Sequence, residues 1–141
     1  MLSRRAFGAC AICSAVGLVG SGAEAQPSTR GQIPSQNPNL KVTTLRRADL
    51  PSGAYEVIQL LVEAAPNATV ARHTHPGVES VVVLEGSGEQ AIDGQPPLPV
   101  SAGDTWQVLA GVPHGGRYGP QGCKFIVTLS VEKGKPMTSP A

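Results

Sequence analysis

His73, His75, Glu79 and His114 form the set of side chains in this sequence best suited to hold a metal ion. His73 and His75 are two positions apart, so on a strand both imidazoles point to the same face. Glu79 follows beyond a Pro-Gly turn and begins the next strand, from which it can fold back beside the pair, while His114 comes after a later strand. Imidazole and carboxylate ligands suit iron, manganese, nickel, zinc or copper but not calcium. Four such ligands also leave open positions for water or a substrate.

The segment that must position these side chains is a series of short runs enriched in Val, Ile, Leu or Thr, each bounded by a turn former. The predicted strands cover residues 41–46, 55–64, 69–74, 78–85, 89–93, 98–100, 105–109 and 124–132. So many strands in about 90 residues, without helical periodicity, predict a sandwich or a closed barrel. A barrel of this size has an interior wide enough for one small ligand.

Two motifs in this segment favour a metal site over a pair of surface histidines. The pattern His73-x-His75-x-x-x-Glu79, followed by Gly86, resembles the first motif of the cupin superfamily. Gly103-Asp104 followed by Gly111-Val112-Pro113-His114 resembles the second. The resemblance implies a small antiparallel jelly-roll β-barrel with four metal ligands, which map onto His73, His75, Glu79 and His114. In some relatives the equivalent glutamate leaves the metal to accept a substrate proton, so the resemblance also makes Glu79 the candidate catalytic base.

Other polar and aromatic side chains are candidates to line the pocket of such a barrel. They are Tyr55, Gln59, Trp106, Gln107 and Tyr118, each of which is equally suited to a packing or rim position. Arg72 neighbours a ligand and is therefore expected to point to the opposite face of its strand.

The first 25 residues have the pattern of an export signal and are left out of the fold prediction. A twin-arginine segment, Ser3-Arg4-Arg5-Ala6-Phe7, precedes an apolar stretch over residues 9–19, and a small-residue cleavage site ends at Ala25. The apolar stretch is too short to span a membrane. We therefore expect a periplasmic or secreted protein, with no membrane attachment after cleavage. In the mature chain, residues 26–40 are expected to form a flexible arm, residues 41–132 the barrel and residues 133–141 a tail.

The choice of metal follows from the type of export signal. By affinity alone, copper or zinc would capture a histidine-rich site outside the cytoplasm, and nickel would also bind. The twin-arginine segment resembles signals that carry folded proteins, so Fe(II) or Mn(II) taken up in the cytoplasm is favoured. Cys123 is the one cysteine that remains after cleavage, so it cannot form an intramolecular disulfide, and it is expected in the core or at a strand edge.

Composition excludes several classes of partner. The chain has 141 residues and a formal net charge of +1, which gives no field to attract nucleic acid or an anionic membrane. No nucleotide-binding motif follows a strand, and no serine or cysteine nucleophile lies in a motif. A small barrel exposes sheet edges, so a homodimer is expected.

Three functions agree with these features, and all involve a small-molecule partner. The first is an Fe(II)- or Mn(II)-dependent dioxygenase that acts on a chelating enol, diketone or catechol-like substrate. The second is a metal-dependent isomerase or lyase, with Glu79 or a tyrosine as base. The third is a non-catalytic binding protein for a sugar or small acid, or a metal store, because no dedicated acid–base pair accompanies the ligands.

Overall fold

The computed structural model describes residues 31–33, 35 and 37–141, and in these residues every regular element is a strand. The signal peptide predicted over residues 1–25 lies outside the described residues. No helix in the described part is long and apolar enough to cross a membrane. The strands are β1 (Gly31–Ile33), β2 (Leu40–Asp49), β3 (Tyr55–Ala64), β4 (Thr69–Thr74), β5 (Gly77–Ile92), β6 (Leu98–Ser101), β7 (Thr105–Val108), β8 (His114–Glu132) and β9 (Ser139–Pro140).

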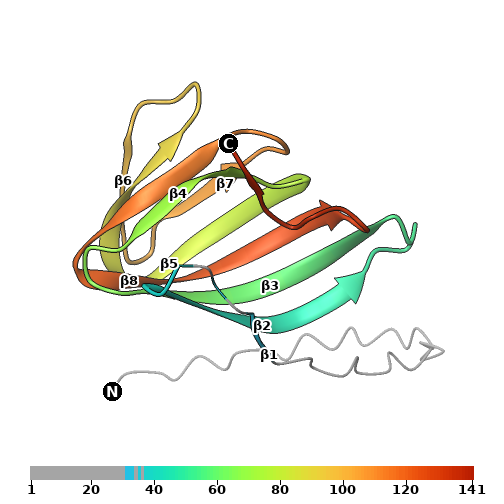
Figure 1. Cartoon of the computed structure of the whole chain (residues 1–141), viewed down its shortest axis with the longest axis horizontal. Helices are drawn as coiled ribbons and strands as arrows, with labels where there is room; N and C mark the ends of the chain where they lie inside the picture. Colours follow the sequence, from blue (N-terminus) through green and yellow to red (C-terminus); the bar gives the residue numbers. More distant parts are fainter. Residues whose placement is uncertain (1–30, 34, 36) are drawn as a thin grey trace, which may run out of the picture.

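The long strand β8 joins the two halves of a curled antiparallel sheet. Its C-terminal half pairs with β3 on one side and with the first half of β5 on the other. Its N-terminal half pairs with β4 and with the second half of β5. In Figure 1 these two halves of β8, orange and red, lie in different layers and meet at one end of the molecule. The predicted all-β antiparallel barrel of jelly-roll type is confirmed.

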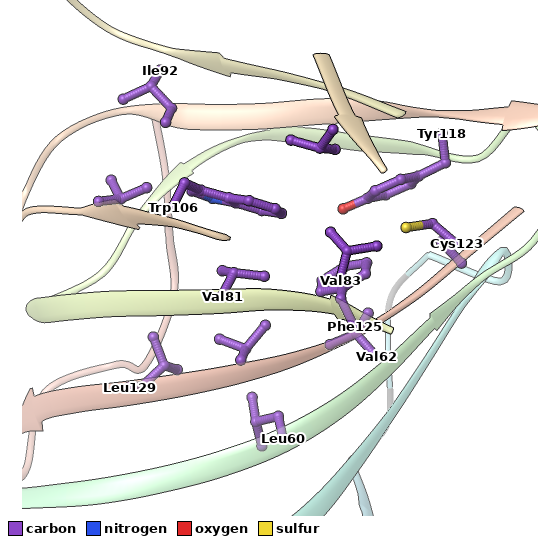
Figure 2. Close-up of a cluster of buried hydrophobic side chains, with 14 of the residues drawn as sticks. Leu60, Val62, Val81, Val83, Ile92, Trp106, Tyr118, Cys123, Phe125 and Leu129 are labelled. Carbon is purple, nitrogen blue, oxygen red and sulfur yellow. The ribbon is translucent and has the colours of Figure 1, made fainter. Parts of the chain in front are cut away.

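Alternating side chains on β3 and β8 fill the interior. Along β3, Ile58, Leu60 and Val62 are buried, while the residues between them are only partly covered. Their counterparts on β8 include Phe125 and Val127, and Figure 2 shows this buried cluster. Cys123 belongs to the same core as a free thiol, and burial raises its pKa.

β5 and β8 are longer than the sequence predicts because their glycines form bulges rather than ends. Gly86 was expected to end one strand before the next, yet β5 continues through it with register shifts on either side. Gly86 has a φ of 82°, and a Cβ there would lie 2.1 Å from the carbonyl oxygen of Gly122. Only glycine fits this left-handed conformation and close approach.

The two chain ends within the described residues are paired with the sheet. Residues 31–33, part of the expected flexible arm, form β1 against residues 42–44 of β2. In the expected tail, β9 pairs with His73 and Thr74 at the end of β4. Backbone hydrogen bonding to an open strand edge stabilises both segments, although neither has the apolar pattern of a core strand.

Candidate metal centre

The three histidines meet because β4 and β8 are neighbours. His73 lies near the end of β4 and is the register partner of His114, the first residue of β8, while His75 follows directly after β4. One ligand nitrogen from each ring lies within 4.8 Å of the other two. The centroids of the His73 and His114 rings are 4.3 Å apart. Residues 41 positions apart in sequence thus form one cluster that could bind a metal ion.

Each imidazole is held in the same tautomer by a backbone carbonyl. The Nδ1 atoms of His73 and His114 lie 2.8 Å and 2.9 Å from the carbonyl oxygens of Ala71 and Val112. That of His75 lies 2.6 Å from the carbonyl oxygen of Met137. A carbonyl oxygen only accepts, so each Nδ1 carries the proton and each Nε2 keeps its lone pair. Hydrogen bonding of this kind orients histidine ligands in metal sites.

Glu79, near the start of β5, places a carboxylate beside two of the three histidines. Its carboxylate oxygens lie 3.1 Å from Nε2 of His114 and 3.8 Å from Nε2 of His75. Nε2 of His114 is buried without a hydrogen-bond partner among the described residues. A lone-pair nitrogen beside a carboxylate, both out of water, is unfavourable unless a proton or a cation lies between them. The arrangement therefore fits a divalent cation held by three imidazoles and a carboxylate.

Burial and charge set the protonation of the three rings. Burial lowers the pKa of both His73 and His75, which outweighs their backbone hydrogen bonds and favours the neutral ligand form. Burial also acts to lower the pKa of His114, but the neighbouring Glu79 carboxylate and the carbonyl of Val112 raise it overall. A proton at His114 is thus the competitor of a metal ion at this position.

The cluster lies on the wall of a cavity of about 590 Å³. All four predicted ligands line it, and so do Trp106 and Tyr118. Most of the remaining wall is apolar, with side chains such as Leu60, Val62, Phe125, Val127 and Leu129. A volume of this size suits a small organic ligand.

Three predicted pocket residues do not line this cavity. Tyr55 and Gln59 occupy outward positions of β3, and Tyr55, its first residue, is 43% exposed. Gln107 lies on the outer face of β7, where its amide donates to Ser80 Oγ at 2.9 Å. The alternation of strand side chains explains these positions, because buried residues flank Gln59 and Gln107 and the buried Glu56 follows Tyr55. Arg72 was expected to point away, yet it contributes to the cavity lining and pairs with Asp93 at 2.7 Å.

Gln90 and Met137 also belong to the site, although no sequence pattern indicates them. Gln90 is 4% exposed and lines the cavity. It lies eleven positions after the inward-facing Glu79, and in a regular strand an odd separation would place it on the outer face. The register shifts around Gly86 change the parity of β5, so a bulge prediction at this glycine could have found it. Met137 acts through a backbone carbonyl, for which the sequence has no signal.

Part of this chain is similar to known proteins. Residues 60–128 match the model described as the cupin domain. The polyketide cyclase RemF from Streptomyces resistomycificus has a TM-score of 0.61 and 25% identity, with 80% of each chain covered. An RmlC-like cupin from Shewanella frigidimarina NCIMB 400 has a TM-score of 0.59 and 21% identity, over 75% of this chain and 87% of its own.

A larger protein shares the fold over part of its length. The DMSP lyase DddQ from Ruegeria pomeroyi DSS-3 has a TM-score of 0.57 and 21% identity. The alignment covers 60% of this chain and 43% of the lyase. No curated protein matches this sequence. The matched residues hold the whole histidine cluster, and the solved structures share the barrel fold, so this part of the chain is similar to the cupin domain.

Proposed function

We propose that this protein is a metal-dependent dioxygenase that uses His73, His75, His114 and Glu79 to hold Fe(II) or Mn(II). Its substrate would be a small chelating compound such as an enol, a diketone or a catechol-like molecule. The observation that carries the proposal is the convergence of three Nε2 lone pairs and a buried carboxylate on the wall of a largely apolar cavity.

The polar groups of the cavity favour chemistry that a metal supplies. Among the described residues that line it, Glu79 is the one carboxylate, and no lysine and no histidine outside the ligand set accompanies it. Bound Fe(II) would allow O2 to react with a chelated substrate at the open positions. Both oxygen atoms enter the products, and the substrate itself supplies the electrons that reduce O2, so no further reductant is required.

Glu79 would have two functions in this reaction. Its negative charge balances part of the charge of a divalent ion, and its position beside His114 and His75 lets it accept the proton that an enol or catechol loses on chelation. The apolar walls exclude water from this proton transfer.

A metal-dependent lyase or isomerase is the second candidate, and the same carboxylate favours it. A buried base next to a Lewis acid can remove a proton from a substrate without O2. The solved structures of similar fold include proteins named as a lyase and a cyclase. Their low identity leaves the reaction of this chain to experiment.

Oxygen consumption separates the two candidates. Fe(II)-loaded protein should consume O2 stoichiometrically with a diketone, enol or catechol from a test panel, and the His114→Ala variant should not. Substrate turnover without O2 uptake would support the lyase or isomerase. Firm metal binding with neither O2 uptake nor turnover would refute both and favour a binding protein.

A further inference from the structure

A pair of buried polar side chains, Gln90 on β5 and Tyr118 on β8, interrupts the apolar wall of the cavity. Gln90 is 4% exposed and Tyr118 is 6% exposed, and both line the same cavity as the histidine cluster. The amide nitrogen of Gln90 lies 3.5 Å from the hydroxyl oxygen of Tyr118. Figure 2 shows this hydroxyl directed inward, toward Trp106.

Glycines opposite the pair leave the space that both side chains occupy. The register pairs Gln90 with Gly116 and Tyr118 with Gly88. A Cβ on Gly116 would lie 2.8 Å from the Gln90 amide, and one on Gly88 would lie 2.8 Å from a ring carbon of Tyr118. Both side chains therefore lie across the neighbouring strand in space that only glycine leaves free. The Tyr118 ring also stacks on Phe125, with centroids 5.2 Å apart.

The pair can form more hydrogen bonds than it makes among the described residues. A glutamine amide offers two donors and a carbonyl acceptor, and a phenol offers one donor and an acceptor. Among the described residues, the long contact between them is the one side-chain hydrogen bond that either group makes. Burial raises the pKa of the Tyr118 phenol, so it remains a neutral donor. Polar groups left in such a state are strong determinants of which ligand binds.

The remaining cavity wall excludes strongly polar ligands. Arg72 is the one lysine or arginine that lines it in the described part of the chain, and its guanidinium is bound to Asp93 and half exposed. An anionic group away from the metal would therefore find no cation to pair with. A sugar would leave most of its hydroxyls against aliphatic and aromatic side chains without partners.

We infer that Gln90 and Tyr118 form a subsite for one uncharged hydroxyl or carbonyl oxygen on an otherwise apolar, ring-containing substrate. This inference rests on the proposed function in one respect, since the chelating oxygens of the same substrate face the histidines. The subsite selects apolar hydroxylated diketones or related ring compounds over sugars and small dicarboxylic acids.

Trp106 allows a direct binding test, because it is the one tryptophan of the chain and lines the cavity. The full chain, kept metal-free with a chelator, is titrated with dibenzoylmethane and with its analogue that carries one 4-hydroxyl group, and quenching of Trp106 fluorescence is followed. We expect both to bind, and the hydroxylated compound to bind about tenfold more tightly. Glucose and oxalate should leave the fluorescence unchanged.

Substitutions test whether Gln90 and Tyr118 cause the preference for the hydroxylated diketone. Gln90→Leu and Tyr118→Phe should each bring the affinity ratio of the two diketones close to one, whereas Gln107→Leu, on the outer face, should leave it at about ten. A ratio that both subsite variants retain would overturn the inference. Wild-type protein that binds glucose or oxalate in preference to the diketones would also overturn it, even if the variants fail to fold. Because no metal is present and only binding is measured, loss of the dioxygenase activity cannot produce either result.

Discussion

At the scale of single residues, the three histidines differ in what orients them. The rings of His73 and His114 are each held by the carbonyl two residues earlier in the same segment. The ring of His75 is held by Met137, which is 62 positions away. Two ligands thus depend on local backbone, and the third depends on a contact that forms only when the chain end folds back.

Removal of one imidazole should abolish firm metal binding. In the His114→Ala variant the metal loses a ligand, and Glu79 loses the neighbour 3.1 Å from its carboxylate. We expect the affinity for Fe(II) or Mn(II) to fall at least about 100-fold in anaerobic calorimetry. Gln107→Ala is the control, since its side chain lies on the outer face of β7. Equal affinity in wild type and His114→Ala would contradict the assignment of His114 as a ligand.

At the scale of elements, the segment after β8 belongs to the metal centre as well as to the sheet. β9 pairs with His73 and Thr74. Met137 and Thr138, which lie between β8 and β9 in sequence, line the cavity. This segment lies outside the residues that match the cupin domain model. It therefore adds to the common barrel a carbonyl that orients one ligand.

Deletion of residues 137–141 should weaken metal binding without unfolding the barrel. The deletion removes the carbonyl that accepts from Nδ1 of His75, so this ring loses its fixed orientation. We expect metal affinity to fall about 10- to 100-fold, with the β-sheet circular dichroism unchanged. Met137→Ala keeps the backbone carbonyl and should bind metal nearly as well as wild type. The prediction fails if the truncated protein and wild type have the same affinity.

A partly buried ion pair between β2 and β3 should make stability depend on pH. Glu56 lies at an inward position of β3, and its carboxylate accepts from Nη2 of Arg47 at 2.7 Å. This hydrogen bond lowers the pKa of Glu56 from its usual 4.5, outweighing the effect of burial. Because the folded-state pKa is depressed, the stabilisation is complete above pH 4.5 and is lost as pH falls through the folded-state value.

Denaturant unfolding of the Glu56→Gln variant tests this dependence. At neutral pH its free energy of unfolding should be about 1 kcal/mol below that of wild type. The difference should shrink below pH 4.5, the usual pKa of the group. Glu63→Gln, on the same strand but with a side chain 36% exposed against 11% for Glu56, should cost less than about 0.5 kcal/mol. A difference that stays constant from neutral to acidic pH would contradict this account.

At the scale of the whole molecule, we propose that the barrel forms a homodimer. Several large apolar side chains remain exposed, among them Leu109 at 66% and Leu84 at 45%. A small barrel gains stability when such surface and its open strand edges are covered. Light scattering on the purified chain should give twice the 14.5 kDa of one copy. A mass of 14.5 kDa at micromolar concentration would refute the dimer.

We further propose that the twin-arginine segment directs the folded protein out of the cytoplasm. Replacement of Arg4 and Arg5 by lysine keeps the charge but removes the guanidinium pair. Cell fractionation should then find the protein in the cytoplasm, whereas wild type is found in the periplasm. The pair Arg46 and Arg47, changed to lysine in the same way, is the control and should not alter location. Export of the Arg4→Lys, Arg5→Lys variant would contradict the proposal.

The sequence by itself determined the strand-rich barrel and the identity of the side chains that form the histidine cluster. Alternating apolar residues and turn formers are local properties, and they specify antiparallel strands without knowledge of the partners. The spacing of His73 and His75 similarly places both rings on one face of a strand wherever that strand lies. Both features depend on residues that are close together in sequence, so they can be predicted from the order of residues alone.

Only the tertiary structure decided which wall residues face the cavity and what holds the third histidine. The bulge at Gly86 changes the parity of β5 and turns Gln90 inward, and at this bulge the carbonyl oxygen of Gly122 lies 2.1 Å from where a Cβ of residue 86 would be. The Met137 carbonyl reaches His75 only after the chain end pairs with β4. Both depend on contacts between segments distant in sequence. The glycine at position 86 permits the bulge without specifying the strand beside it, and a backbone carbonyl such as that of Met137 is common to every residue type.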